Sequence, residues 1–465
     1  MNPSNAVLSP LLPPHALMCR FESDTPTCTS YPAANRFVEA IGTDDVTRAL
    51  RLRSSRSIVG GRAPLAIRLN IPFCERPSDR CNCRPVVTRR HDGVARYLRA
   101  LQDEIALVLH DLGCGRMVSR IHVGGAVPLF LSDDELAQVV AMLRASFRVT
   151  DDAAISIEAA ASLCTPARIA GLSAAAFNRL FIELDDMRAV DMGGARLRDA
   201  IEAARRIGFT GVTVEIPSAA INQGGLHFSC FVAQAAELLP ARIRITRPHT
   251  RRGRPSVVRG RATPLMASSI ENSGRLRDAF ERLLSAGYVH VGLDEFALPE
   301  DALVTASRHG RLHLGVRGFS NRSEGDLLGL GVSAIGRVGA VAYRNVDLLS
   351  DYYAALQAER LSVARGLVLD RDDLARESVI KGLLCQGQVP FEAISLSHLI
   401  DMRSSFVKEF ALLEPLIQAG LVDVDHEALE LTAMGRWFAP VVAAVFDREL
   451  QRDALRVRLS RGDAP

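Results

Sequence analysis

The stretch Leu65-Ala-Ile-Arg-Leu-Asn-Ile71-Pro-Phe-Cys74-Glu-Arg-Pro-Ser78-Asp-Arg-Cys81-Asn-Cys83 joins an apolar run to a cysteine-rich loop. The first seven residues are typical of a strand that lies buried in a parallel sheet. In parallel βα folds, ligands bind at the carboxyl ends of the strands, where this loop falls. Three neighbouring thiols predict a metal or cluster site there, although three thiolates without a fourth ligand are a weak zinc signature.

Similar apolar runs recur along the chain, with amphipathic helical stretches between them. A helix is predicted over residues 93–110, and another follows the capping box formed by Ser132 and Glu135. This alternation predicts an α/β fold built as a parallel barrel or part of one. The strands are expected at residues 65–71, 120–124, 154–159, 179–184, 212–217, 242–246 and 288–293.

Polar and glycine residues follow several of these strands, and the barrel would gather them around one mouth. Each also has a plain structural explanation, because paired glycines suit tight turns and acidic residues stabilise helix N-termini. They are the cysteine loop, Gly124-Gly125-Ala126, Glu158, Asp185, Glu215 and His249.

A strongly basic stretch begins at the strand expected over residues 242–246. It holds eight arginines between Arg242 and Arg261. Arg242, Arg244 and Arg247, with His249, are candidates for binding a polyanion at the mouth, whereas the part from Arg251 onward is expected to be a solvated loop. The stretch has no aromatic residue on which bases could stack, so nucleic acid is not expected as a partner.

After residue 300 the pattern changes to Gly-rich loops, of which 325–335 is the densest. Beyond residue 366, helices are predicted over 371–386, 395–419 and 433–449, with a hairpin over 421–432. We therefore expect an N-terminal segment over residues 1–60, a barrel over 61–365 and a helical C-terminal domain with a wing over 366–465.

Composition narrows the class of protein further. The chain has 465 residues, a formal net charge of +3 and 48% hydrophobic residues, as an ordinary globular protein does. It contains no continuous apolar run of about 18 residues, so no membrane span is expected. The nine cysteines are odd in number and mostly scattered, which indicates reduced thiols. A cytoplasmic monomer is the expectation.

Several short motifs occur in a characteristic order along the chain. They are Thr29-Ser-Tyr-Pro32, Ile71-Pro-Phe-Cys74, Cys81-Asn-Cys83, Val86-Val-Thr88, His122-Val-Gly-Gly125, Ser156-Ile-Glu158, Gly208-Phe-Thr210, Asp326-Leu-Leu-Gly329, Gly331-Val-Ser-Ala-Ile335 and Val379-Ile-Lys381. With these motifs the chain resembles the oxygen-independent coproporphyrinogen III oxidases of the radical S-adenosylmethionine (SAM) superfamily over nearly its whole length.

The resemblance implies a fold and a reaction. The fold would be a partial (β/α) TIM-like barrel of the radical SAM type, with an N-terminal extension and a helical, winged-helix-like C-terminal domain. The cofactors would be a [4Fe-4S] cluster and SAM, and an electron donor would be needed. The implied reaction of haem biosynthesis is the radical oxidative decarboxylation of coproporphyrinogen III to protoporphyrinogen IX.

The family motif C-x3-C-x2-C-x-C places the cluster ligands on Cys74, Ser78 and Cys81. Ser78 stands where a thiolate is expected, and a hydroxyl is a poorer ligand for iron, so Cys83 is the alternative third ligand. The implied SAM-binding positions are Gly125, Glu158, Asp185, Glu215 and Ile335.

The chain departs from the family around these cofactors, at Arg68, Asn70, Arg80 and Val127 among other positions. Two hypotheses follow, and the residues leave both open. The first is a coproporphyrinogen III oxidase-like enzyme, with catalytic residues unassigned. The second is a catalytically inactive homologue that binds haem or porphyrin for delivery or sensing, with Cys74, Cys83 or His249 as an iron ligand.

Overall fold

The computed structural model describes residues 12–22, 30–55, 64–75, 86–184, 195–218, 228–246, 269–315, 317–323 and 325–451. Its centre is a strongly curved sheet of twelve strands. Seven neighbouring strands run parallel and form the partial barrel. In sheet order they are β13 (Leu327–Leu330), β1 (Leu65–Ile71), β4 (Met117–Gly125), β5 (Arg148–Ala160), β6 (Arg179–Glu183), β7 (Gly211–Pro217) and β8 (Arg242–Thr246).

Antiparallel strands extend the sheet at both edges. Beyond β13 lie β14 (Ile335–Val338), β15 (Val341–Asn345) and β16 (Val363–Val368), and beyond β8 lie β10 (Glu295–Ala297) and β9 (Val289–Gly292). The prediction of a seventh barrel strand over 288–293 was therefore wrong in its role, because β9 pairs antiparallel with β10. Leu293 and Asp294, both at positive φ, make a tight turn that joins only antiparallel neighbours.

The strand that completes the parallel set instead lies in the Gly-rich stretch 325–335, which was expected to be a loop. Gly329 lies within this strand, β13. The position requires glycine because a Cβ there would lie 2.5 Å from the backbone carbon of Ile335. Glycine in this strand thus permits the close approach of β14, as glycines within strands often do.

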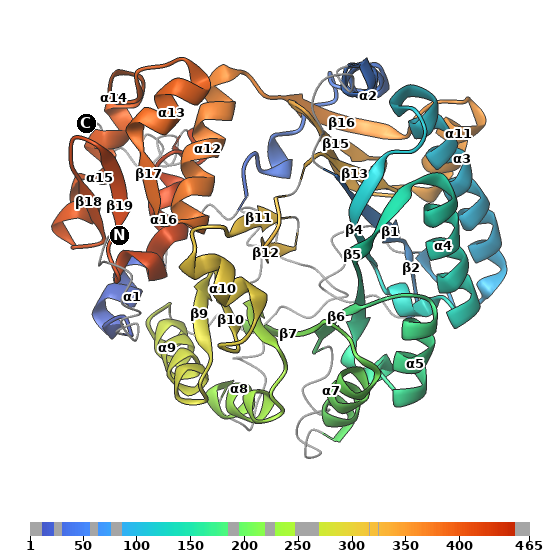
Figure 1. Cartoon of the computed structure of the whole chain (residues 1–465), viewed down its shortest axis with the longest axis horizontal. Coiled ribbons are helices and arrows are strands. Elements are labelled where there is room, and N and C mark those ends of the chain that lie inside the picture. Colours follow the sequence, from blue (N-terminus) through green and yellow to red (C-terminus); the bar gives the residue numbers. More distant parts are fainter. Residues whose placement is uncertain are drawn as a thin grey trace, which may run out of the picture.

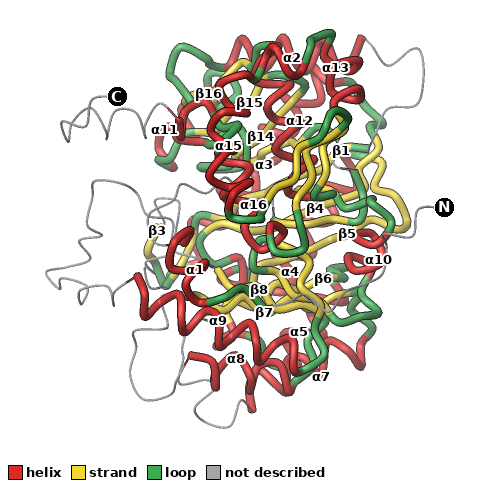
Figure 2. Tube along the Cα trace, turned by 90° about the vertical axis from the view of Figure 1, so that its left-hand side faces the viewer, coloured by secondary structure: helices red, strands yellow, loops and turns green. Residues whose placement is uncertain are grey.

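Helices cover the outer side of the barrel (Figures 1 and 2). The capping box of Ser132 and Glu135 is present at the start of α4, as predicted. The apolar faces of the helices pack against strands that are themselves buried on both sides, as parallel sheets require. The helices are α3 (Val94–Leu112), α4 (Asp133–Ser146), α5 (Pro166–Ala174), α7 (Ala195–Ile207), α8 (Phe228–Glu237) and α9 (Ser269–Ser285).

The remaining elements lie around the barrel. Figure 1 shows the hairpin of β11 and β12 within the curve of the sheet, where it faces the inner side of the strands. The helix α2 contacts β14, β15 and β16, and α1 contacts α9. The bounds are α1 (His15–Glu22), α2 (Thr43–Ser55), β2 (Phe73–Cys74), β3 (Val86–Val87), α10 (Ala302–Arg308), β11 (His313–Gly315), β12 (Gly318–Ser320) and α11 (Leu349–Gln357).

The C-terminal part is mainly helical and carries a small three-stranded sheet, so the predicted fold class is confirmed. The hairpin predicted over 421–432 is present as β18 and β19. The elements are α12 (Arg371–Cys385), β17 (Gln388–Pro390), α13 (Phe391–His398), α14 (Met402–Ser405), α15 (Val407–Gln418), β18 (Val422–Val424), β19 (Ala428–Leu431) and α16 (Ala439–Ala444).

Two helix predictions in this part were wrong in extent. The helix expected over 395–419 is interrupted at Leu399, which takes a left-handed conformation with φ of 53° and ends α13. The helix expected over 433–449 is divided because Pro440 opens a new helix, α16, where its missing N–H costs nothing.

The N-terminal segment bridges the two parts of the chain. The Tyr31 hydroxyl donates a 2.7 Å hydrogen bond to Asp373 at the start of α12, and Arg36 donates one of 3.2 Å to the same carboxylate. Val38 forms an isolated antiparallel bridge with Gly366 at the edge of the large sheet. Within the described ranges, no helix has the length and apolar character needed to span a bilayer.

Candidate functional site

A network of buried ion pairs fills the inside of the barrel near the carboxyl ends of its strands. Arg317, from the turn between β11 and β12, lies 3.2 Å from Glu158 and 2.8 Å from Glu215. Arg244 lies 2.9 Å from Glu215 and 3.0 Å from Glu295. Each of the three carboxylates in this network is thus paired with at least one of the two guanidinium groups.

Strand alternation explains why these side chains meet. Successive side chains of a strand point to opposite faces, so every second residue of each strand points inward. In the register of the sheet, Glu158 of β5 pairs with Phe181 of β6, and Glu215 of β7 pairs with Arg244 of β8. Both arginines also lie near the Phe181 ring, whose centroid is 5.2 Å from the Arg317 guanidinium and 5.9 Å from that of Arg244.

The ion pairs perturb the titration of Glu158. Burial acts to raise the pKa of Glu158, but the charge of Arg317 and the hydrogen bond from His122 outweigh burial and hold this pKa well below its usual range. Burial also acts to lower the pKa of Arg317, and Glu158 and Glu215 reverse that effect. Glu158 and Arg317 are therefore both charged at neutral pH.

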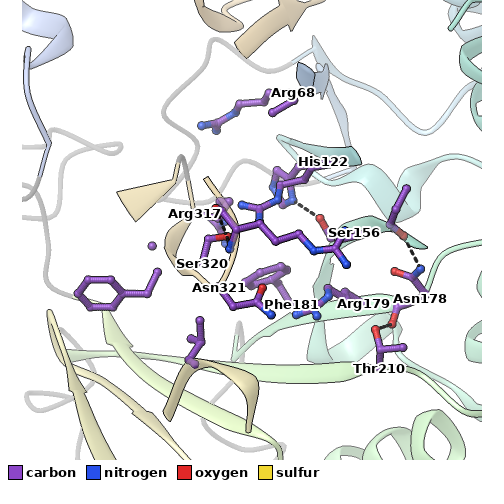
Figure 3. Close-up of a pocket in the computed structure, with 18 of the residues that line it drawn as sticks. Arg68, His122, Ser156, Asn178, Arg179, Phe181, Thr210, Arg317, Ser320 and Asn321 are labelled. Atoms are coloured by element: carbon purple, nitrogen blue, oxygen red, sulfur yellow. Dashed lines mark hydrogen bonds between the residues drawn. The ribbon is translucent and has the colours of Figure 1, made fainter. Parts of the chain in front are cut away.

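His122 of β4 is the second partner of Glu158. Its Nε2 lies 2.9 Å from Oε1 of Glu158, and its Nδ1 lies 2.9 Å from the Ser156 hydroxyl. Burial lowers the pKa of His122 despite the nearby carboxylate, so the ring is neutral at pH 7. Because a carboxylate can only accept, Nε2 carries the proton and donates it to Glu158. Figure 3 shows His122 and Arg317 side by side, with Phe181 below them.

Gly124 and Gly125 are both required by close packing. A Cβ on Gly124 would lie 2.7 Å from Oε1 of Glu158. Gly125 has φ of +122°, and a Cβ there would lie 2.4 Å from the carbonyl oxygen of Ile71. These contacts within the chain account for the glycine pair and fix the end of β4 against β1.

The structure brings only some of the predicted site residues together. Glu158 and Glu215 share Arg317, and Gly125 lies directly after the glycine that packs on Glu158. Ile335 begins β14, which β13 separates from β1. The predicted positions Ser78, Cys81, Cys83, Asp185, Arg247 and His249 lie outside the described residues.

Cys74 is the predicted cluster ligand that the structure describes. It ends β2, pairs with Val87 of β3 and is fully buried. Among the residues that the structure describes, no group of three or more His, Cys, Asp and Glu side chains could hold a metal ion.

The two arginines on β8, Arg242 and Arg244, are already paired with carboxylates of the chain and are not available to bind an anion. Arg242 forms a bidentate pair with Asp301, with both hydrogen bonds at 2.9 Å, and Arg244 is held by Glu215 and Glu295. Sequence reasoning missed Arg317 and Glu295, which come from elements that it did not predict. Alternation along β5 and β7 identifies the inward carboxylates, but no sequence signal places their partner at residue 317.

The chain is similar to curated proteins over nearly its full length. It is 31% identical over 455 residues to the oxygen-independent coproporphyrinogen III oxidase of Escherichia coli, covering 96% of this chain and 97% of that protein. It is 30% identical over 443 residues to the protein of the same name from Pseudomonas aeruginosa, covering 93% and 95% of the two chains.

A solved structure agrees with these matches. The coproporphyrinogen III oxidase of Escherichia coli, described as a radical SAM enzyme, superposes with a TM-score of 0.79 at 29% identity. The match covers 91% of this chain and 97% of that one. In addition, residues 369–438 match the family model described as the HemN C-terminal domain.

Proposed function

Since the chain belongs to the oxygen-independent coproporphyrinogen III oxidase family, we propose that it acts on coproporphyrinogen III in haem biosynthesis. The reaction is the one that the resemblance implies, oxidative decarboxylation of two propionate side chains to vinyl groups. The observation that carries the proposal is the match along the whole chain, in sequence and in fold together. We also propose that the protein is a cytoplasmic monomer and that a separate donor supplies its electrons. The domain boundaries are proposed to lie after residues 60 and 365.

The cluster would be held by Cys74 and by thiols of the loop that follows it. Cys74 suits this role because it lies three residues after the carboxyl end of the barrel strand β1, the end where such folds bind their ligands. We propose Cys81 and Cys83 as the other ligands, with Ser78 at the position where the family has a thiolate. When bound, the cluster would supply the electron that starts the radical chemistry.

The carboxylates proposed to contact SAM do not fit that cofactor in their present arrangement. SAM carries a sulfonium and an ammonium group, and it would need negative charge that is not already neutralised. Glu158 and Glu215 are both paired with Arg317, which is itself a cation. Bringing a second cation beside Arg317 would be opposed by like-charge repulsion in a partly buried site. We therefore propose that SAM binds weakly and that turnover is slow.

The test is anaerobic reconstitution of the full chain with iron and sulfide. Cluster formation is followed by absorption and electron paramagnetic resonance, SAM cleavage by release of 5′-deoxyadenosine, and turnover by conversion of coproporphyrinogen III. A cluster that supports slow SAM cleavage and conversion is the expected result. Failure to form a cluster, together with stoichiometric haem or porphyrin binding, would overturn the oxidase proposal in favour of the inactive homologue.

Two cysteine variants sharpen this test. Cys74→Ala should abolish cluster formation, whereas Cys230→Ala, a partly buried cysteine on α8, should leave it unchanged. Ser78→Cys should raise the iron and sulfide bound per chain, because a thiolate is a better ligand for iron than a hydroxyl. No gain in iron content would show that Ser78 does not limit cluster formation.

A further inference from the structure

A cavity of about 360 Å³ opens inside the barrel on the side opposite to the mouth that carries Cys74. Its walls come from the beginnings of parallel strands: Ala66 near the start of β1, Arg179 at the start of β6 and Arg242 at the start of β8. Thr210, just before β7, completes this end. The cavity therefore reaches from the amino ends of the strands to their middle, where Arg68, His122 and Phe181 line it.

This cavity adjoins the proposed cofactor positions but is not lined by them. None of the described positions Gly125, Glu158, Glu215 and Ile335 is among the residues that line it. His122, Arg244 and Arg317 lie on the boundary, because they line the cavity and also bind Glu158 or Glu215.

The lining is rich in arginine, and most of that charge is already neutralised. The lining arginines are Arg68, Arg120, Arg179, Arg242, Arg244, Arg317 and Arg322. Those paired with carboxylates are Arg242 with Asp301, Arg244 with Glu215 and Glu295, Arg317 with Glu158 and Glu215, and Arg322 with Asp152. Asp151 and Asp152 supply the negative charge of the lining itself, both at exposed positions.

Arg179 differs from the other lining arginines. Within the described part of the chain it donates no hydrogen bond and forms no ion pair, and its side chain projects into the cavity (Figure 3). Burial, followed by the positive charge of Arg242, lowers the pKa of Arg179 to about 10. Arg120 and Arg322 act in the same direction, and Asp301 opposes them only in part. A half-buried guanidinium with more positive than negative charge around it is stabilised by an anion that joins it.

We propose that this cavity binds a small oxyanion carrying at least two negative charges, with Arg179 as its principal contact. The planar guanidinium fork suits two oxygens of a carboxylate or a phosphate. Arg120, which donates to the Ser320 hydroxyl, adds positive charge, and Asn321 adds an amide to the same wall. A volume of about 360 Å³ suits a ligand at the small end of the usual range of binding pockets.

The test is calorimetric titration of the full chain with inorganic phosphate and, separately, with citrate. Saturable binding at one site per chain is expected for at least one of them. A preference for phosphate would indicate a phosphorylated ligand, and a preference for citrate would indicate a polycarboxylate. Binding should weaken as salt rises from about 0.05 M to about 0.5 M, because the attraction is electrostatic. Failure of both anions to bind would overturn the proposal.

Two variants localise the binding. Arg179→Gln should weaken it about tenfold or more, as expected for loss of a charged hydrogen-bond donor. Arg198→Gln removes an exposed arginine from the outside of α7 and should leave it unchanged. Equal effects of the two variants would overturn the assignment. In the absence of any added anion, Arg179→Gln should unfold at the same temperature as the wild type or at a higher one. A lower unfolding temperature would instead indicate that Arg179 has a structural role.

Discussion

Replacing Arg317 with glutamine is the change that most directly tests the ion-pair network. Glutamine keeps most of the side-chain length and some hydrogen bonding but removes the positive charge. Glu158 and Glu215 would then lose a shared cation, while each keeps one other donor, His122 and Arg244 respectively. We expect Arg317→Gln to be less stable than the wild type and to bind SAM more tightly.

The magnitude follows from burial. Removing one partner of a buried ion pair costs about 3–5 kcal/mol. The side chains of Arg317 and Glu158 are 27% and 20% exposed, and both carboxylates keep a donor, so we expect about 2–3 kcal/mol here. In the folded chain the pKa of Glu158 is held below its usual range. This stabilisation is therefore fully present at pH values above the pKa that Glu158 has in the unfolded chain. It is lost as pH falls through the folded pKa, so the two proteins should converge in acid.

The assays are urea unfolding followed by circular dichroism at neutral and acid pH, and SAM binding by calorimetry under anaerobic conditions. Arg322→Gln is the matched control, because Arg322 follows the same hairpin and forms an ion pair with Asp152. The side chains of Arg322 and Asp152 are 44% and 67% exposed. Solvent screens such an exposed pair, so its loss should change stability little. The reasoning is refuted if Arg317→Gln unfolds like Arg322→Gln at neutral pH, or if its affinity for SAM equals that of the wild type.

Three further changes test other parts of the fold. Burial raises the pKa of Glu104 to about 7, so stability should fall by up to about 3 kcal/mol as pH rises from about 4.5 to about 7, and Glu104→Gln should flatten that slope in urea melts. Gly125→Ala should cost about 2 kcal/mol or more in thermal unfolding, because strain adds to a clash with β1, whereas Gly208→Ala, with φ of +94° and open space around it, should cost about 1 kcal/mol. Asp373→Asn should lower stability by about 1.5–3 kcal/mol, because Asp373 accepts from Tyr31 and from charged donors, and faster proteolysis before residue 37 would report the loss.

Much of the barrel could be predicted because its strands contain short runs rich in apolar residues that end up buried. Six of the seven parallel strands follow from such apolar-rich runs, and β1 shows the burial that results, with six of its seven residues buried. The seventh, β13, escaped prediction because its residues Leu327 to Leu330 sit among glycines that resemble a loop. Those glycines are present for close packing, which depends on a neighbour that local sequence does not reveal.

The candidate site was predictable only for residues at strand ends. Glu158 and Glu215 are inward carboxylates on strands, so periodicity identifies them. Their partner Arg317 lies in a short hairpin more than one hundred residues later in the chain, and only the three-dimensional fold brings it between them. The break at Leu399 was missed for a similar reason, since this residue is 79% exposed in a left-handed conformation that its type does not favour.

The pairing of β1 with β13 has a consequence for synthesis of the chain on the ribosome. Ala66 pairs with Leu327, so one edge of the first barrel strand stays unpaired until the ribosome has added about 260 more residues. At about 5–20 residues per second, that wait lasts roughly 13–50 s. During this interval the N–H and C=O groups along that edge can pair with another nascent chain. Slower elongation before residue 327, or a stop codon placed there, should therefore increase aggregation.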